Sequence, residues 1–214
     1  MSINALLLPD SIQRLALTSV ERAVKRALDL IVSITAIVLS SPLFLIVALA
    51  IKLDSSGPVI FRQRRIGLEA REFIIFKFRT MTVLEDGPVV TQACRDDRRV
   101  TYIGKFLRRS SLDELPQLFN VLRGDMSLVG PRPHALAHDD HYRVHIADYA
   151  CRHYVKPGIT GWAQVHGLRG ETASLEQMAN RVKLDLWYIN NSSPGLDLNI
   201  LLRTCLEVLR DRAY

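Results

Sequence analysis

The longest hydrophobic stretch of the chain runs from Ala27 to Ile51 and carries no charged residue after Asp29. A helix of about 22 residues covers about 33 Å, which is enough to cross the hydrocarbon core of a bilayer. The stretch begins too far along the chain for an ordinary signal peptide, and no small-residue cleavage site follows it. This pattern predicts a membrane helix.

A proline interrupts the hydrophobic stretch near its middle. Pro42 removes one helical hydrogen bond and clashes with the preceding turn, so it bends or breaks the helix. The hydroxyls of Ser40 and Ser41 are able to satisfy the carbonyl groups that the proline leaves unpaired inside lipid. Each half of the stretch is then too short to cross the membrane alone.

Both flanks of the stretch are basic, and positively charged residues beside a membrane helix favour the cytoplasmic side. Two cytoplasmic ends predict a re-entrant helix with a kink at Ser41 and Pro42, anchored in one leaflet. A straight spanning helix and a buried helix of a soluble domain are the alternatives. The flanking cations are Arg14, Arg22, Lys25 and Arg26 before the stretch and Lys52, Arg62, Arg64 and Arg65 after it.

The rest of the chain reads as two short strands followed by a series of helices. Two β-rich runs around Gly67 predict a β-hairpin, and Ser174 with Gln177 forms a capping box at a helix start. The last helix carries an apolar stripe, so it packs on the core or lies on the membrane surface. The expected elements are strands at 59–64 and 72–79, helices at 101–109, 114–123, 134–155, from Ser174 onward and at 197–210, and loops at 82–100, 124–133 and 156–167.

These elements predict an α+β fold that is mostly helical, with amphipathic helices at the membrane interface. The expected parts are an N-terminal extension (1–21) without an assigned role, the re-entrant membrane helix (22–56) and a cytoplasmic domain (57–214).

The second β-rich run has two different faces. Ile74, Phe76 and Phe78 share one face, whereas Lys77 and Arg79 share the other, because side chains alternate along a strand. Two neighbouring cations beyond an apolar face are able to clamp a phosphate. A solvated strand face explains the same pattern equally well.

Composition changes this picture in two ways. The net charge is +6, from 28 basic and 22 acidic residues, which fits an anionic partner such as phospholipid, nucleotide or nucleic acid. The three cysteines, Cys94, Cys151 and Cys205, are far apart and form neither a disulfide framework nor a zinc motif. We therefore expect them to be small buried hydrophobic residues in a reducing compartment.

Two adjacent carboxylates lie in the stretch RRSSLDELPQL, residues 108–118. Ser111 and Glu114 fit a capping box, although Pro116 is awkward in that helical register. Alternatively, Asp113 and Glu114 bind Mg²⁺ or divide the roles of nucleophile and metal ligand, helped by the preceding arginines. The stretch alone does not decide between capping and catalysis. The nearby cations, the Gly/Pro-rich loops and the membrane anchor favour catalysis.

Three long motifs carry a resemblance to a known family: KRALDL…SSPLFLIVALAIKLDSSGPVIFRQRRIG…FIIFKFRTM, LRRSSLDELPQLFNVLRGDMSLVGPRP and VKPGITGWAQV. They resemble the bacterial sugar transferases, monotopic phosphoglycosyl transferases that begin glycan assembly on polyprenol phosphate. The resemblance covers residues 22–214 in the family's order. It implies that residues 57–214 are a phosphoglycosyl transferase domain at the cytoplasmic face of the bacterial inner membrane.

The resemblance implies a two-step exchange. Asp113 would attack the sugar-bearing phosphate of a UDP-sugar and release UMP, and undecaprenyl phosphate would then accept the phosphosugar. Glu114 matches the family's Mg²⁺-binding acid. Asp185, which lies at the edge of an apolar stripe where a carboxylate needs a partner, matches a family acid near the site. The residues expected to contact phosphate or nucleotide are Lys77, Arg79, Arg108, Arg132 and Gln164.

The stretches PRPHALAHDDHYR and HGLRGETASLEQMANRVKLDLWYI resemble the subgroup that uses UDP-glucose. His166 and Leu168 replace the Asn and Trp that this subgroup commonly has, so UDP-galactose and a UDP-N-acetylhexosamine are alternative donors. Larger members carry further membrane helices and a domain ahead of this region, and we expect this chain to be the short form with the catalytic core alone. The expected partners are a UDP-sugar, undecaprenyl phosphate, membrane lipid and a second copy of the chain in a homodimer.

Other interpretations remain open from the sequence. A non-enzymatic membrane adaptor would use the basic face to bind anionic lipid. A nucleic-acid partner is not expected, because the basic residues are not interleaved with aromatics and no recognition motif occurs. Four histidines spaced along one predicted helical face fit packing or surface roles, or a metal site completed by Asp139 or Asp140. These histidines are His134, His138, His141 and His145.

Overall fold

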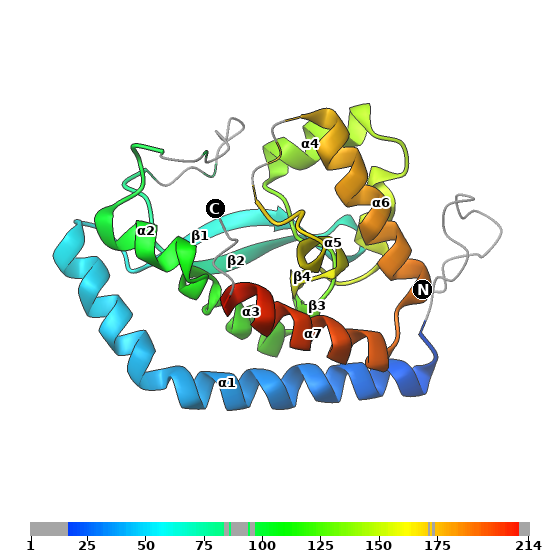
Figure 1. The fold of residues 1–214 in the computed structure, drawn as a ribbon, viewed down its shortest axis with the longest axis horizontal. Helices are drawn as coiled ribbons and strands as arrows, with labels where there is room; N and C mark the ends of the chain where they lie inside the picture. Colours follow the sequence, from blue (N-terminus) through cyan, green and yellow to red (C-terminus); the bar gives the residue numbers. More distant parts are fainter. Residues whose placement is uncertain are drawn as a thin grey trace.

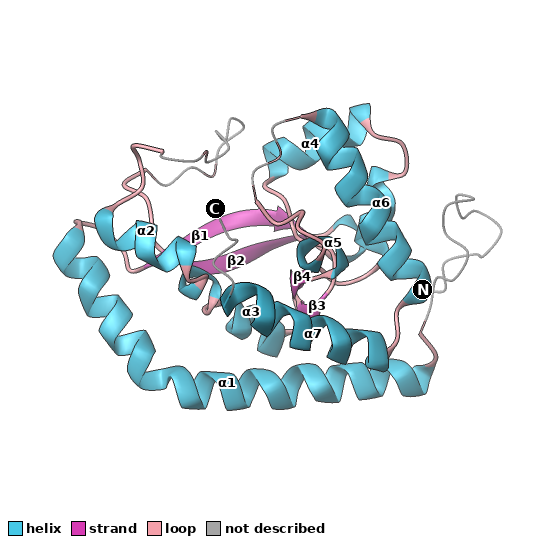
Figure 2. Cartoon of the chain, viewed as in Figure 1, coloured by secondary structure: helices cyan, strands magenta, loops and turns pink. Residues whose placement is uncertain are grey.

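The computed structural model describes residues 17–83, 86, 94, 97–170, 172 and 174–209; Arg14 and residues 1–16 of the expected extension lie outside this part. The described residues are mostly helical, with a short hairpin, as expected (Figure 2). The elements are α1 (Ser19–Asp54), β1 (Ile60–Ile66), η2 (Leu68–Ala70), β2 (Glu72–Phe78), α2 (Tyr102–Arg109), η3 (Leu112–Glu114), α3 (Gln117–Arg123), β3 (Ser127–Val129), α4 (Leu136–His145), η4 (Tyr149–Tyr154), β4 (Gly158–Thr160), α5 (Trp162–Val165), α6 (Leu175–Asn191) and α7 (Pro194–Leu209).

The hydrophobic stretch forms one continuous helix, α1, with Pro42 inside it. Ser41 donates a hydrogen bond of 2.8 Å to the carbonyl oxygen of Val38, the acceptor that Pro42 cannot use. Ser40 similarly donates to Ala36 at 2.5 Å. The serine hydroxyls therefore occupy carbonyl groups around the proline, as expected. In Figure 1 the ribbon of α1 runs beneath α3 and α7 and then changes direction toward α2.

One side of α1 packs on the rest of the fold and another is exposed. Asp29 is buried and accepts hydrogen bonds from the Ser127 hydroxyl and the Leu128 amide of β3. By length and composition α1 is able to cross a membrane, with a mean hydropathy of 2.5 over 18 residues. The re-entrant path stays a prediction. The exposed apolar side chains of α1 are Val20, Val24, Ile31, Val32, Ile34, Val38, Leu39, Leu45, Ile46, Leu49 and Leu53.

Two of the cations before the stretch, Lys25 and Arg26, attach α1 to other elements of the fold. Lys25 pairs with Asp197 of α7 at 2.5 Å and donates to the Val129 carbonyl at 3.1 Å. Arg26 donates to carbonyl oxygens at the end of α3. Such groups stabilise a helix C-terminus. The expectation that these two residues only mark the cytoplasmic side was too simple, because both attach α1 to the core.

The predicted hairpin is confirmed, with β1 and β2 antiparallel and Gln63 opposite Ile75. The predicted apolar face of β2 is wrong at one position: Ile74 is 44% exposed, whereas Ile75 on the opposite face is 2% exposed. Asn120 explains part of this, because its side chain bonds the backbone of Ile74 and Phe76 and brings α3 against β2. Both faces of the hairpin are therefore partly covered.

A short parallel pair, β3 and β4, lies within segments expected to be loops. The two backbone segments approach closely at Gly130 and Gly158, where a Cβ on Gly158 would lie 2.1 Å from the Gly130 nitrogen. Only glycine fits such an approach. Three-residue strands have too few positions for a periodic signal, so the sequence predicted turns here.

Most helices begin and end near their expected positions. The expected helix at 134–155 is wrong in its middle, because Ile146 is extended and Asp148 is left-handed, which separates α4 from η4. Ser174 caps α6 as predicted, since its hydroxyl accepts from the Gln177 amide. Cys151 is buried as expected, but Cys94 and Cys205 are exposed.

Candidate active site

The two carboxylates lie in η3, a single 3-10 turn between α2 and α3. Ser111 before them has φ 59° and ψ 13° and makes no side-chain capping bond, so the capping-box interpretation is wrong. The turn instead closes through the Glu114 amide, which donates to the Ser111 carbonyl at 3.2 Å. Glu114 is thereby buried, whereas Asp113 is half-buried.

Glu114 is surrounded by cations from three other segments. Lys77 of β2 bonds its Oε1 at 2.8 Å, and Arg132 bonds both oxygens at 2.5 and 3.2 Å. Arg169 lies 3.9 Å from Oε2. Burial alone would raise the pKa of Glu114, but Arg132 and Lys77 outweigh burial and hold the pKa well below its ordinary value. Glu114 is therefore an ionised carboxylate that organises the cations.

Asp113 has a different environment from its neighbour. Within the described residues its carboxylate makes no hydrogen bond and no ion pair. Burial raises the pKa of Asp113 to about 6; the charge of Glu114 adds to the rise, while Lys77 and Arg108 oppose it. A carboxylate with unoccupied oxygens beside several cations is suited to attack a phosphorus atom that carries negative charge.

Lys77 and Arg79 do not share one role in the structure. Burial lowers the pKa of Lys77 despite its pairing with Glu114. Arg79 is 3% exposed and donates to the carbonyl oxygens of Ser55 and Ser56 at 2.7 and 2.5 Å. These bonds cap the C-terminal end of α1, so Arg79 is committed to the fold rather than directed toward the dyad.

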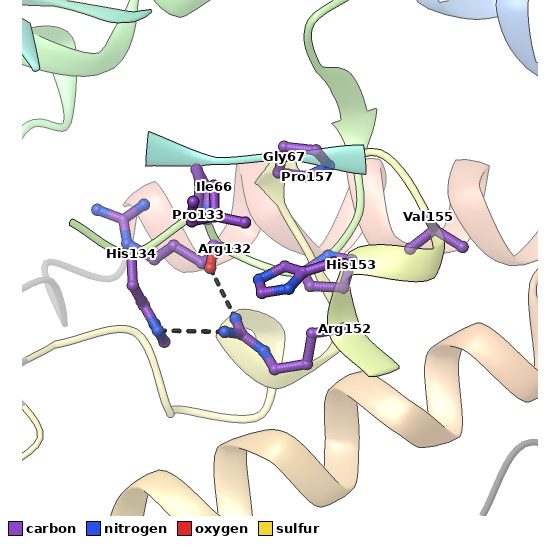
Figure 3. A pocket seen from close by; sticks show the side chains of 10 residues that line it. Ile66, Gly67, Arg132, Pro133, His134, Arg152, His153, Val155 and Pro157 are labelled. Atoms are coloured by element: carbon purple, nitrogen blue, oxygen red, sulfur yellow. Dashed lines mark hydrogen bonds between the residues drawn. The ribbon is translucent and has the colours of Figure 1, made fainter. Parts of the chain in front are cut away.

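Arg132 lies in the Pro-Arg-Pro segment between β3 and α4, next to a small pocket (Figure 3). Its backbone carbonyl accepts a hydrogen bond of 2.7 Å from Arg152 of η4. Arg152 in turn pairs with Asp185 of α6 at 2.8 Å. Burial raises the pKa of Asp185, although the Arg152 charge opposes this effect. Asp185 is therefore linked to the dyad through Arg152 and Arg132.

Two further predicted residues have distinct positions. Arg108 lies in the last turn of α2, where its charge lowers the pKa of Asp113. Gln164 of α5 is buried and donates to the Ile159 carbonyl at 3.1 Å, while its Oε1 has no hydrogen-bond partner among the described residues. The dyad, Lys77, Arg108 and Arg132 thus come together, whereas Gln164 contacts β4.

Sequence reasoning missed two cations near the dyad. Arg169 belongs to a glycine-flanked loop, and Arg65 is half-buried near Arg132 and donates to the Pro133 carbonyl at 3.0 Å. Burial and the charge of Arg132 lower the pKa of Arg65 to about 10. Arg65 directly follows the first expected strand, and the basic flank of the membrane stretch accounted for it without a role at the site.

The four histidines do not form one site. His134 is buried, and its Nδ1 lies 2.6 Å from the Tyr149 hydroxyl. His145 lies on α4, and its Nδ1 contacts the His141 carbonyl at 2.7 Å. Within the part of the chain that the structure describes, no three His, Cys, Asp or Glu side chains gather to hold a metal.

Comparison with known proteins identifies the family. A family model described as "Bacterial sugar transferase" matches residues 20–211. The chain belongs to this family. The match includes α1 from its second residue, both sheets and every residue of the candidate site.

Several curated relatives of this sugar transferase are similar along most of the chain. A UDP-glucose:undecaprenyl-phosphate glucose-1-phosphate transferase of Escherichia coli K12 is 52% identical over 92% of the chain and 42% of the relative. A protein with the same description from Caulobacter vibrioides is 55% identical over 89% of the chain and 72% of the relative. A UDP-N-acetylgalactosamine-undecaprenyl-phosphate N-acetylgalactosaminephosphotransferase of Aeromonas hydrophila is 44% identical over 87% of the chain and 44% of the relative. The chain thus spans about two fifths of the E. coli relative.

The donor chemistry of the dyad fits Mg²⁺, which binds carboxylate oxygens and keeps several waters. Among the described residues the oxygens of Asp113 accept no hydrogen bond, whereas Glu114 Oε1 contacts Lys77 and Arg132 and Oε2 contacts Arg132. An ionised carboxylate has about four acceptor sites, so Glu114 would keep acceptor capacity for a cation beside these bonds.

Proposed function

We propose that this sugar transferase moves a hexose 1-phosphate, glucose 1-phosphate in the first instance, from a UDP-sugar to undecaprenyl phosphate. The observation that carries this proposal is the contrast within the dyad: Glu114 is paired with cations, while Asp113 has no bonding partner among the described residues and burial raises its pKa to about 6. This arrangement provides one nucleophile and a cationic surface for a diphosphate.

In the first step a carboxylate oxygen of Asp113 attacks the phosphorus that bears the sugar. The bond from that phosphorus to the oxygen bridging the two phosphates breaks, and UMP leaves with that oxygen. An acyl phosphate links Asp113 to the sugar. In the second step a phosphate oxygen of undecaprenyl phosphate attacks the same phosphorus, the bond to Asp113 breaks, and the carboxylate is restored.

The cations near the dyad stabilise the charge that develops during both steps. Lys77 and Arg132 are oriented by Glu114, so they need little rearrangement to meet the equatorial oxygens of the transferred group. Arg108 favours the ionised form of Asp113. Mg²⁺, with Glu114 as its protein ligand, would supply further neutralisation of the diphosphate charge.

The donor assignment rests on the relatives. The two most similar relatives described above are UDP-glucose enzymes by their printed names, which supports UDP-glucose for this chain. The Aeromonas relative uses an N-acetylhexosamine donor by its name, so UDP-galactose and a UDP-N-acetylhexosamine are the alternatives. The product would begin an exopolysaccharide or another surface glycan.

The proposed location is the cytoplasmic face of the bacterial inner membrane. The apolar helix α1 and the family indicate membrane association. A re-entrant α1, together with amphipathic helices at the interface, would keep the dyad where a soluble nucleotide sugar meets a lipid phosphate. Arg79, Gln164 and a homodimer have no assigned step in this proposal.

Asp113→Asn in the full chain tests the nucleophile. The wild-type protein, incubated with UDP-glucose alone, is expected to release UMP and to gain the mass of a hexose phosphate on the peptide that contains Asp113. The variant is expected to do neither. UMP release by Asp113→Asn at the wild-type rate, or turnover without any adduct in rapidly quenched samples, would refute the covalent step.

A membrane adaptor makes the opposite prediction. It would bind vesicles of anionic lipid equally well with and without the dyad, and it would release no UMP from any UDP-sugar. A radiolabelled panel of UDP-glucose, UDP-galactose and UDP-N-acetylhexosamines with undecaprenyl phosphate decides between these functions and identifies the donor.

A further inference from the structure

Each of the three consecutive carbonyl groups of the Pro-Arg-Pro segment accepts a hydrogen bond from another part of the fold. The Pro131 carbonyl accepts from the first amide of β4 at 2.9 Å, the Arg132 carbonyl from Arg152 at 2.7 Å, and the Pro133 carbonyl from Arg65 at 3.0 Å. The two proline rings fix their own φ angles. The backbone of the segment is therefore rigid on both sides of Arg132, and only the Arg132 side chain extends toward Glu114.

Arg152 makes the largest number of different contacts among the described residues that hold the Pro-Arg-Pro segment. It is 3% exposed, its Nε pairs with Asp185 at 2.8 Å, and its Nη1 lies 3.1 Å from His134 Nδ1. Its guanidinium also lies over the Tyr149 ring, 5.0 Å from the centroid. Figure 3 shows Arg152 bonded to both His134 and the Arg132 carbonyl. The planar fork of an arginine makes these contacts at once, which a lysine cannot do.

We propose that Arg152 is a positioning residue for Arg132 and that Asp185 acts through Arg152. Asp185 fixes one edge of the buried guanidinium, so the other edge is directed at the Arg132 carbonyl. This hydrogen bond in turn fixes the backbone of Arg132, from which the side chain extends to bond both oxygens of Glu114. Asp185 and Arg152 thus couple the position of α6 to the position of Arg132 beside the dyad. The effect of this coupling on catalysis rests on the proposed function; the positioning itself does not.

Asp197 provides a matched control for Asp185. Both are buried aspartates, 4% and 2% exposed respectively, and each is paired with one cation, on the neighbouring helices α7 and α6. Asp197 pairs with Lys25, whereas Asp185 pairs with Arg152, the residue that bonds the Arg132 carbonyl. Asn substitution at either position removes the carboxylate that pairs with a cation, buried in the case of Arg152 and half-buried in the case of Lys25, so both variants are expected to lose stability.

A double-mutant cycle on UMP release separates positioning from stability. Asp185→Asn is expected to lower kcat about 10- to 100-fold, the scale of a small misplacement of a charged group, and to lower it no further when Arg132 is already Ala. Asp197→Asn is expected to change kcat less than about twofold in both backgrounds. An unchanged kcat in Asp185→Asn, or an equal loss with and without Arg132, would overturn the proposal. Arg152→Lys, which retains the charge beside Asp185, is expected to follow Asp185→Asn and replaces it if that variant does not fold.

A second measurement needs no turnover. In nitrogen-15-labelled full chain in detergent micelles, the Arg132 Nε–H signal is assigned by its loss in Arg132→Ala. This signal is expected to shift in Asp185→Asn and Arg152→Lys and to stay in place in Asp197→Asn. An unshifted signal refutes positioning even if the variants are inactive. If the wild-type protein releases no UMP, the proposed function fails, while this spectrum still decides whether Asp185 and Arg152 position Arg132.

Discussion

Asp113 and Glu114 are neighbours in the chain with opposite perturbations of their pKa values. Lys77 and Arg132 bond Glu114 and keep it ionised, whereas Asp113 has no bonding partner among the described residues. Burial then dominates at Asp113 and raises its pKa to about 6. The division of roles within the dyad thus follows from which carboxylate faces the cations.

The raised pKa of Asp113 predicts a pH dependence. Below pH about 6 its carboxyl is protonated and cannot attack, so the initial rate of UMP release should rise as the pH increases through about 6 and level off above it. Arg108→Gln should move the midpoint upward, because the Arg108 charge lowers the pKa. Arg109→Gln, at the neighbouring exposed position, serves as the control. A midpoint near the ordinary aspartate value of about 4 would contradict this assignment.

Substitution of Arg79 is expected to lower the stability of the fold rather than kcat. Arg79→Met removes the bonds to Ser55 and Ser56 at the end of α1, and the free energy of unfolding should fall by about 3 kcal/mol. Lys105→Met at an exposed position of α2 should change it by less than about 0.5 kcal/mol. Thermal unfolding in micelles measures both. If the variant keeps its stability but loses kcat at saturating UDP-glucose, Arg79 contacts phosphate after all.

The residues show what sequence could and could not predict about the site. The adjacent acids were visible as a short pattern that did not by itself decide their role, and Arg132 was expected only from the resemblance to the family. Lys77 and Arg79 were not distinguishable, because they lie two positions apart on one strand face while the end of α1 reaches only Arg79. Arg152 was missed, because its importance lies in contacts with segments far away in the chain.

At the scale of elements, the pair β3–β4 carries the Pro-Arg-Pro segment and was not predicted. Long periodic elements such as α1, α6 and the hairpin were predicted well, because many positions repeat the same signal. The strands β3 and β4 have three residues each, and their pairing depends on contact between distant glycines. Such a contact has no local sequence period.

Gly158→Ala tests the importance of this close approach. The added Cβ would lie 2.1 Å from the Gly130 nitrogen, so the free energy of unfolding should fall by about 3 kcal/mol. Gly195→Ala in α7 is the matched control, because a Cβ there meets nothing within 4 Å, and it should be neutral or stabilising by up to about 1 kcal/mol. Equal stabilities of the two variants in urea titrations would contradict the packing of β3 on β4.

At the scale of the whole molecule, the path of α1 relative to the bilayer is testable by labelling. Cysteines are introduced at Ser19, the exposed first residue of α1, and at Ser56, an exposed residue just after its C-terminal end, once Cys94 and Cys205 are replaced. In spheroplasts a membrane-impermeant maleimide should reach neither end until the cells are opened, because a re-entrant helix keeps both ends in the cytoplasm.

Replacement of Ser41 and Pro42 by Ala in this background should straighten α1 and expose one end to the reagent from outside. If one end of the unaltered helix is already labelled in intact spheroplasts, α1 crosses the membrane. Labelling of a periplasmic reporter verifies that the reagent enters that compartment.

The bonds from Lys25 and Arg26 to the core have a mechanical consequence. They fix the first turns of α1 to α3, β3 and α7, so α1 is held against the rest of the fold by direct bonds. Under the proposed function, the height of the dyad above the acyl chains would then be set when the polypeptide folds. Undecaprenyl phosphate would have to bring its phosphate to that fixed height by lateral diffusion in the leaflet.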